Sequence, residues 1–266
     1  AQLPEGIAWE CGMDITDSRD GHIYSTVQIG EQCWMAENMN IGTYIESSTL
    51  MSDNSVIEKY CYGNDEPNCD TYGGIYRWNE MMQYDTIECG QGICPSGWHV
   101  PSESEWCEMA EFVDSTFVFN GSYSGTDVGR KLKSVTDWNG YGTNQSGFTA
   151  LPGGDFRPDA HFTSLGAGAW FWTSSEMQEG YFWYMLLWYD MDGIWNEALT
   201  QEYGYSVRCV KDTEPAAWSC GDPLIDSRDN QSYNTVQIGE QCWMSENIDI
   251  GHMIEPPQAQ SDNSII

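Results

Sequence analysis

Alternation of apolar and polar residues is clearest near the start of the chain. Tyr24, Val27 and Ile29 alternate with polar residues just after Asp20-Gly21, a dipeptide that favours tight turns, so this region predicts a β-hairpin. The stretch 29–35 predicts a further strand–turn–strand unit. The best strand candidates in the second half of the chain are 148–151, 169–174, 181–189 and 205–210.

Helical periodicity is confined to short stretches. Ser102-Glu-Ser-Glu105 has the pattern of a capping box, in which the serine and the glutamate satisfy each other's backbone N–H groups. It is followed by an apolar face at helical spacing, formed by Trp106, Met109, Ala110 and Val113. Shorter helices are expected over 79–84 and 129–134. The many tryptophans, tyrosines and glycines indicate a loop-rich fold that contains β-structure and aromatic packing.

An internal repeat determines the domain organisation. Residues 26–35, Thr-Val-Gln-Ile-Gly-Glu-Gln-Cys-Trp-Met, return unchanged as residues 235–244, an offset of 235 − 26 = 209. Without a gap, 8–57 and 217–266 are identical at 30 of 50 positions. A fragment of about fifty residues buries too little apolar surface to be stable alone. The second copy is therefore expected to dock on a neighbouring unit, as 8–57 docks on its own body.

We divide the chain accordingly. Residues 1–13 are read as a lead-in, 14–212 as the main domain, 213–216 as a linker and 217–266 as a partial repeat of 8–57. The hypothesis is a head-to-tail contact between units, which generates filaments when it does not close into a ring.

Charge excludes two classes of partner. Ten Lys and Arg residues stand against 41 Asp and Glu residues, which gives a net charge of −31. Such a chain repels the phosphates of nucleic acids and anionic membranes, and it attracts cations. The sequence also contains no apolar run of about twenty residues that would span a membrane.

Ten cysteines indicate disulfide bonds and therefore an extracellular or cell-surface location. Close spacing predicts the pairs Cys61–Cys69 and Cys89–Cys94. Neither a Cys-x₂-Cys motif nor a Cys/His spacing typical of zinc sites occurs, so the sequence predicts no metal framework and no required cofactor.

Six motifs appear in a fixed order along the first unit. They are Gly30-Glu-Gln-Cys-Trp-Met-Ala-Glu-Asn38, Tyr72-Gly-Gly-Ile-Tyr-Arg-Trp78, Ile93-Cys-Pro-Ser-Gly-Trp-His-Val-Pro-Ser102 with Glu105-Trp106, Gly147-Phe-Thr-Ala-Leu-Pro-Gly-Gly154, Phe171-Trp-Thr-Ser-Ser-Glu176 and Tyr205-Ser-Val-Arg-Cys-Val-Lys211. Together they resemble the Fibrobacter succinogenes major paralogous domain, over roughly 14–212 and again from 222 to 251.

The resemblance implies a secreted or surface-attached domain without an established activity. It also implies a distant similarity to the formylglycine-generating enzyme and to C-type-lectin-like folds. These are irregular, loop-rich α+β folds in which the two chain ends lie together. A disulfide between Cys33 and Cys209 is then expected, and Cys11 is left to pair with Cys107. Cys220 and Cys242 repeat Cys11 and Cys33, so they pair with each other or with another copy. Together with Trp243 they are the candidate residues of a contact between units.

Other candidate sites rest on short patterns. Asn120, Asn144 and Asn230 fit the N-glycosylation triplet, and Thr86 and Ser115 fit an Asp-Ser/Thr pattern for O-linked glycans. Calcium is a further candidate ligand, because oxygen-bearing residues are dense in one short stretch, namely Asp190, Asp192, Asn196 and Glu197.

We expect no enzymatic activity. An oxidase related to the formylglycine-generating enzyme needs a reactive cysteine pair, whereas 134–208 contains no cysteine. The principal hypothesis is a structural protomer of an extracellular filament or tandem-repeat fibre, whose partners are copies of itself. The alternative is a secreted carbohydrate-binding or adhesion module, in which tryptophans at 170, 172, 183, 188 and 195 stack on sugar rings.

Overall fold

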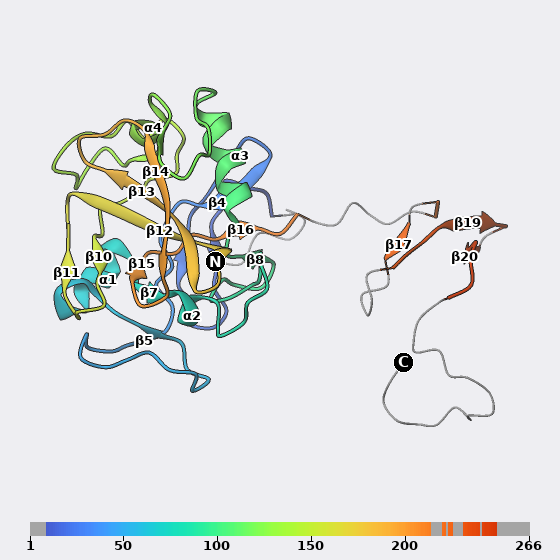
Figure 1. Cartoon of the computed structure of the whole chain (residues 1–266), viewed down its shortest axis with the longest axis horizontal. Coiled ribbons are helices and arrows are strands. Elements are labelled where there is room, and N and C mark those ends of the chain that lie inside the picture. Colours follow the sequence, from blue (N-terminus) through green and yellow to red (C-terminus); the bar gives the residue numbers. More distant parts are fainter. Residues whose placement is uncertain (1–8, 214–219, 222, 226–230, 240, 249–266) are drawn as a thin grey trace. The chain divides into compact units, whose positions relative to one another are not determined.

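The computed structural model describes residues 9–213, 220–221, 223–225, 231–239 and 241–248 (Figure 1). The chain forms two compact units, Ala1–Asp212 and Thr213–Ile266. In the described parts no helix has the length and apolar character needed to cross a membrane. The glycosylation candidate Asn230 and most of the proposed linker, residues 214–216, lie outside the described residues.

Three four-stranded sheets form the scaffold of the first unit (Figure 1). The first has the order β3 (Thr26–Ile29), β4 (Gln32–Met35), β16 (Val210–Lys211) and β8 (Trp98–His99). The second has the order β12 (Gly168–Gln178), β13 (Tyr181–Trp188), β14 (Ile194–Thr200) and β9 (Tyr123–Ser124). The third has the order β11 (Phe162–Thr163), β10 (Asp155–Phe156), β15 (Gly204–Tyr205) and β7 (Tyr76–Arg77).

The remaining elements of this unit are short. Two strand pairs lie outside the larger sheets, β1 (Ile15–Thr16) with β2 (Ile23–Tyr24), and β5 (Thr43–Tyr44) with β6 (Glu58–Lys59). The helices are α1 (Pro67–Tyr72), α2 (Trp78–Met81), α3 (Glu103–Val113) and α4 (Val128–Leu132), with a 3-10 turn at Tyr62–Asn64. The described part of the chain is thus mostly sheet, with few helices and many loops.

Helix α3 begins where the capping box predicts. The backbone N–H of Glu105 donates to Ser102 Oγ at 3.3 Å, and the backbone N–H of Ser102 donates to Glu105 Oε2 at 2.8 Å. Each bond satisfies a donor that the first helical turn leaves unpaired. Trp106, Met109 and Ala110 are buried along the face that the periodicity indicates.

Two large clusters of buried side chains make up most of the core. One contains Trp34, Trp106, Phe148 and Phe171, whose rings contact one another edge to face or at a tilt. The other is built around aromatic residues of β7, α2, β12 and β15. Both clusters contain many large aromatic rings held between short strands and loops, and burial of such rings is strongly stabilising.

Residues 9–13 are part of the first unit and not a separate lead-in. The ring of Trp9 contacts that of Trp98 at 5.9 Å between centroids, and Cys11 forms a disulfide with Cys33. Thr26 Oγ1 donates to the carbonyl of Met13 at 2.7 Å. The predicted boundary at residue 13 is therefore wrong.

The disulfide pattern corrects most of the predicted pairs. Cys61–Cys69 is present as the spacing predicts. Cys94 pairs with Cys209, and not with Cys89. Cys33 pairs with Cys11, and not with Cys209.

Cys89 and Cys107 are free thiols, so the predicted bonds Cys89–Cys94 and Cys11–Cys107 are both wrong. The reason is tertiary. Val210 of β16 pairs with both Trp34 and His99, which brings residue 209 between two chain-distant segments, and the bond formed there is the one to Cys94.

The strand predictions in the second half are mixed. Strand β12 contains the predicted strand 169–174, and β13 covers all but the last residue of the predicted strand 181–189. The two strands pair in antiparallel register. The predicted strand 148–151 is reduced to an isolated bridge between Ala150 and Lys133, and 205–210 is split between the ends of β15 and β16. The turn-flanked strand β14 was not foreseen.

The second unit repeats the local structure of the chain start. Its strands are β17 (Leu224–Ile225), β18 (Ser232–Tyr233), β19 (Thr235–Ile238) and β20 (Gln241–Met244). The β19–β20 pair has the register of β3–β4 shifted by 209 residues, and Cys220–Cys242 corresponds to Cys11–Cys33. The bond from Gly12 N to Thr26 Oγ1 recurs as Gly221 N to Thr235 Oγ1, both at 2.9 Å.

Candidate functional site

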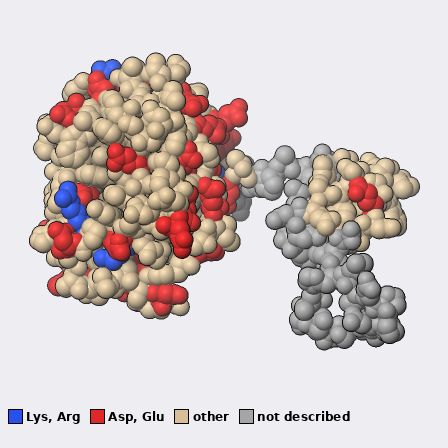
Figure 2. All heavy atoms as spheres, in the orientation of Figure 1, with Lys and Arg blue, Asp and Glu red and all other residues tan. Residues whose placement is uncertain are grey.

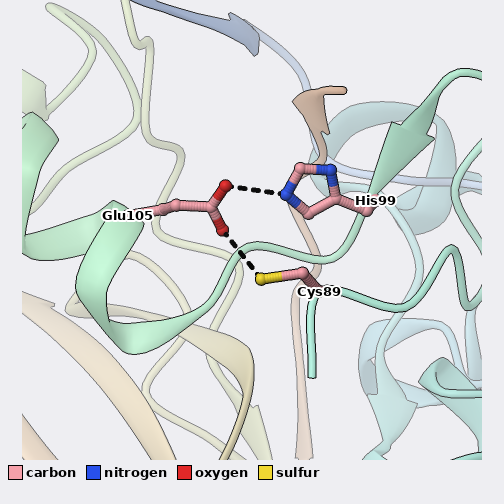
Figure 3. Close-up of side chains that lie close together, drawn as sticks. All are labelled: Cys89, His99 and Glu105. Carbon is pink, nitrogen blue, oxygen red and sulfur yellow. Dashed lines mark hydrogen bonds and ion pairs between the residues drawn. The ribbon is translucent and has the colours of Figure 1, made fainter. Parts of the chain in front are cut away.

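Three side chains of different chemistry converge in the first unit. Cys89 lies in the loop that follows α2, His99 on β8, and Glu105 in the first turn of α3 (Figure 3). One donor atom from each, a sulfur, a ring nitrogen and a carboxylate oxygen, lie within 4.8 Å of one another. In the described part of the chain this is the only such group of three or more His, Cys, Asp or Glu side chains.

His99 is held at both ring nitrogens. Nε2 lies 2.8 Å from Glu105 Oε1, and Nδ1 lies 2.8 Å from Asp212 Oδ1. Two carboxylates can both be partners of one imidazole only if both ring nitrogens carry protons. The histidine is therefore an imidazolium clamped between two anions.

The protonation of this group follows from its surroundings. Burial opposes the charged form of His99, but hydrogen bonds with Cys89, Glu105 and Asp212 outweigh it and raise its pKa to about 10. Burial also opposes the ionised form of Glu105, but hydrogen bonds from His99 and Ser102 outweigh it and lower the pKa of that carboxyl.

Access to the cluster is through Cys89. Its side chain is exposed, whereas only 9 % of His99 is exposed. The thiol lies 3.6 Å from Glu105 Oε2, and the backbone N–H of Cys89 donates to Ser174 Oγ at 3.0 Å, which fixes the loop beside β12. The arrangement presents a thiol, an imidazole and a carboxylate to one point that solvent reaches from the Cys89 side.

Sequence reasoning missed this cluster because it assigned Cys89 to a disulfide with Cys94. The expected structural role of His99 in hydrogen bonding is present, but its partners were not identified. A signal did exist: the capping box fixes Glu105 at the start of α3, six residues after His99.

A second candidate is the β19–β20 hairpin, whose side chains differ in exposure from those of β3–β4. Trp34 is 0 % exposed, whereas the equivalent Trp243 is 54 % exposed. Ile29 is 3 % exposed and its equivalent Ile238 is 63 % exposed. The same sequence therefore has its apolar side covered in the first unit and open in the second.

The predicted calcium residues do not form a common cage. Asn196 is buried and accepts from the Ser122 backbone N–H at 3.0 Å, whereas Glu197, the next residue of β14, is exposed and accepts from Tyr184 Oη at 2.9 Å. Adjacent strand residues point to opposite faces, so these two cannot bind one ion together. Asp192 accepts from Tyr141 Oη, and Asp190 is exposed.

The five tryptophans considered for sugar stacking all contact other rings of the first unit. Trp170 and Trp172 are buried. The others pack against neighbours within 6 Å between ring centroids, as in Trp183 with Phe119, Trp188 with Trp170 and Trp195 with Tyr123.

The glycosylation candidates differ in accessibility. Asn120, Thr86 and Ser115 are exposed. The amide of Asn144 is engaged with Thr149, because its Nδ2 donates to Thr149 Oγ1 at 3.0 Å and its Oδ1 accepts from the Thr149 backbone N–H at 2.8 Å. Glycosylation stays a prediction at these positions.

Among the charged side chains on the visible face of the first unit, acidic ones outnumber basic ones (Figure 2). This matches the net charge of −31 and offers no basic surface there for a phosphate backbone.

The comparisons with known proteins point to one family. The family model described as the Fibrobacter succinogenes major domain matches residues 27–211, which include β4, the Cys89–His99–Glu105 cluster and β16. No curated protein and no solved structure matches the chain.

Proposed function

The chain belongs to the Fibrobacter succinogenes major domain family, and we propose that it is a structural protomer of an extracellular filament or tandem-repeat surface fibre. The units join head to tail, and residues 217–266 of one unit complete the body of the next. The observation that carries this proposal is the open apolar side of the β19–β20 hairpin, whose sequence is identical to a hairpin that is buried in the first unit.

The first unit provides the geometry of the proposed joint. Val210 of β16 pairs with Trp34, and the backbone N–H of Met35 donates to the carbonyl of Cys209 at 3.0 Å. The Trp34 ring contacts those of Trp106 and Phe148, at centroid distances of 5.1 and 5.8 Å. Strand β4 thus pairs with β16 on one side and packs against aromatic rings on its buried face.

The second hairpin has the residues for the same contacts. The first unit's copies of β16, α3 and Phe148 are already taken by β3–β4. The β19–β20 hairpin therefore needs these elements from a unit in which no other hairpin occupies them, such as the next body of a tandem array. Full burial of one large apolar side chain contributes about 1.5–3 kcal/mol. Burial of the side chains of Val236, Ile238 and Trp243 therefore stabilises the joint, each by a contribution of this kind. In addition, the added strand forms hydrogen bonds with backbone groups at the sheet edge.

The proposed joint is noncovalent. Cys220 and Cys242 form a disulfide with each other, so they are not available as the intersubunit bridge that was one alternative from the sequence. The bond instead holds the incoming hairpin in the shape that β3–β4 adopts, which lowers the entropy cost of docking.

The proposal also includes the fold type of the first unit and the location of the protein. The loop-rich first unit with three disulfides is proposed to be a C-type-lectin-like domain, which keeps its chain ends together and so places incoming and outgoing segments close to one body. The disulfides support an extracellular or cell-surface location.

The test compares Trp34 with Trp243 in native assemblies. Negative-stain electron microscopy should show filaments with a regular repeat, and oxidative footprinting by mass spectrometry should find Trp243 protected to nearly the level of Trp34. In the dispersed chain Trp243 should be modified readily and Trp34 should not, because their exposures are 54 % and 0 %. Trp243→Ala should reduce assembly, whereas Leu50→Ala, at a 65 % exposed position of the first unit, is the matched control.

Equal reactivity of Trp243 in filaments and in the dispersed chain would contradict the proposed joint. Material that contains only dispersed monomers and binds to a glycan array would favour the carbohydrate-binding alternative.

A further inference from the structure

We propose that Cys89, His99 and Glu105 form a binding site for a zinc ion, with three protein ligands and one open position facing solvent. The proposal does not depend on the fibre hypothesis, because all three residues lie in the first unit. It rests on the convergence of a sulfur, a nitrogen and an oxygen donor within 4.8 Å. Zinc binds this combination of thiolate, imidazole and carboxylate in tetrahedral sites.

The spacing of the donor atoms fits a tetrahedral ion. Zinc bond lengths of about 2.3 Å to sulfur and about 2.1 Å to oxygen place these two atoms about 3.6 Å apart. The distance from Cys89 Sγ to Glu105 Oε2 is 3.6 Å. The nitrogen–oxygen edge of such a site is about 3.4 Å. His99 Nε2 lies 2.8 Å from the other carboxylate oxygen, Glu105 Oε1, so the ring and the carboxylate move slightly apart when the ion replaces the proton between them.

An outer carboxylate supports the assignment of His99 as a ligand. Zinc-binding histidines characteristically hydrogen-bond through their second nitrogen to a carboxylate or carbonyl, which fixes the ring orientation. Asp212 Oδ1 lies 2.8 Å from His99 Nδ1 and fills this role. Asp212 comes directly after β16, which pairs with β8, so the backbone ladder itself places the carboxylate beside the ring.

The ligands come from elements that are already fixed. His99 lies on β8, Glu105 is locked by its capping-box bonds with Ser102, and the Cys89 backbone is tied to Ser174. Preorganisation of this kind favours metal binding because little side-chain freedom is lost. The exposed Cys89 side leaves the fourth position open to water or to a ligand from outside.

Charge and protons balance in the binding step. Without the ion the cluster contains a thiol and an imidazolium. Binding of Zn²⁺ releases the thiol proton and the Nε2 proton to solvent, and three coordinate bonds form. Two positive charges enter and two leave, so the net charge of the cluster is unchanged. The net charge of −31 raises the concentration of cations around the chain.

The test is titration of the full, disulfide-intact chain with Co²⁺, followed by displacement with Zn²⁺. A sulfur-to-cobalt charge-transfer band in the near ultraviolet should appear and saturate at one equivalent, together with the visible bands of tetrahedral Co²⁺. Zn²⁺ should remove both. The band reports a thiolate ligand and so separates this site from ions held by surface carboxylates.

The second free thiol supplies a matched control. Cys107 also lies 3.6 Å from a carboxylate, Glu103 Oε1, but it belongs to no such cluster. Cys89→Ser should abolish the band and Cys107→Ser should leave it unchanged. Asp212→Asn should keep the band and weaken Co²⁺ binding about 10–100-fold, the usual effect of an outer-shell change.

Folding of each variant is checked by circular dichroism and by the mass of the disulfide-linked peptides. Binding without a sulfur band, a band that survives in Cys89→Ser, or a band that depends equally on Cys107 would overturn the proposal. Isolation of Cys89 in a disulfide with another cysteine would do the same.

Discussion

Replacing Arg208 with methionine should be among the most destabilising single substitutions in the first unit. Arg208 is 0 % exposed, and no carboxylate in the described residues forms an ion pair with it. Its guanidinium is instead held by oxygen acceptors from two chain-distant segments. Nε donates to Asn38 Oδ1 at 2.6 Å, and Nη1 donates to the carbonyls of Met35 and Phe148 at 2.9 and 2.5 Å.

Two further contacts surround the guanidinium of Arg208. Nη2 donates to the carbonyl of Thr149 at 3.0 Å, and the guanidinium carbon lies 4.4 Å from the centroid of the Phe148 ring. Burial lowers the pKa of Arg208. The cation is thus stabilised by carbonyl dipoles and an aromatic face, which compensate for lost hydration.

The magnitude follows from the acceptors left behind. Methionine fills most of the volume but donates to none of the four oxygens. A buried polar group without its partner costs about 1–3 kcal/mol, and part of this is recovered where the backbone relaxes or water enters. With four acceptors left without a donor and part of their cost recovered, the free energy of unfolding should fall by about 3–5 kcal/mol.

Urea denaturation followed by tryptophan fluorescence measures this loss. Arg157→Met is the matched control, because Arg157 is 51 % exposed in its ion pair with Asp155 and should lose less than about 1 kcal/mol. A loss below about 1 kcal/mol for Arg208→Met would refute the reasoning, since it would mean that the four acceptors are readily satisfied without the guanidinium.

Three further predictions use the same unfolding measurement. Trp34→Ala should cost about 3–5 kcal/mol through loss of burial and cavity formation, whereas Trp243→Ala should leave the unfolding of the dispersed chain's first unit unchanged; equal losses would contradict their different exposures. Replacing both Cys94 and Cys209 with alanine should cost about 5 kcal/mol from the release of a loop with a sequence separation of 115, and a loss below about 2 kcal/mol would show that the chain-entropy argument fails here. Asp114 accepts hydrogen bonds from the backbone N–H groups of residues 116, 126 and 127. Burial opposes the ionised form of Asp114, but these hydrogen bonds outweigh it and lower the pKa of the carboxyl. The stabilisation that ionised Asp114 gives to the folded state is therefore present above its ordinary pKa of about 3.9 and is lost as the pH falls towards the folded-state pKa. Asp114→Asn should therefore destabilise the chain at pH 7, and its difference from the unsubstituted chain should shrink in acid; a pH-independent difference would contradict this.

Local features were predicted correctly where neighbouring residues decide them. The start of α3 follows from Ser102 and Glu105, because the capping box closes over four residues. The β3–β4 hairpin follows from apolar alternation around a glycine with φ of +63°, Gly30, in the turn. The family also follows from the sequence, because its motifs are short and ordered along the chain.

The sequence by itself determined the 209-residue repeat, and with it the equivalence of Trp34 and Trp243. It could not determine that one is buried and the other exposed, because burial depends on whether β16 and α3 are supplied to the hairpin. The disulfide partners of Cys33 and Cys209 were also decided by tertiary structure, as was the meeting of Cys89, His99 and Glu105. For the burial of Trp34 and for the Cys94–Cys209 bond, the deciding step is that β16, more than a hundred residues after β8, lies between β4 and β8. Contacts between such distant segments leave no periodic signal in the sequence, because the free energy that selects them comes from the packing of the whole core.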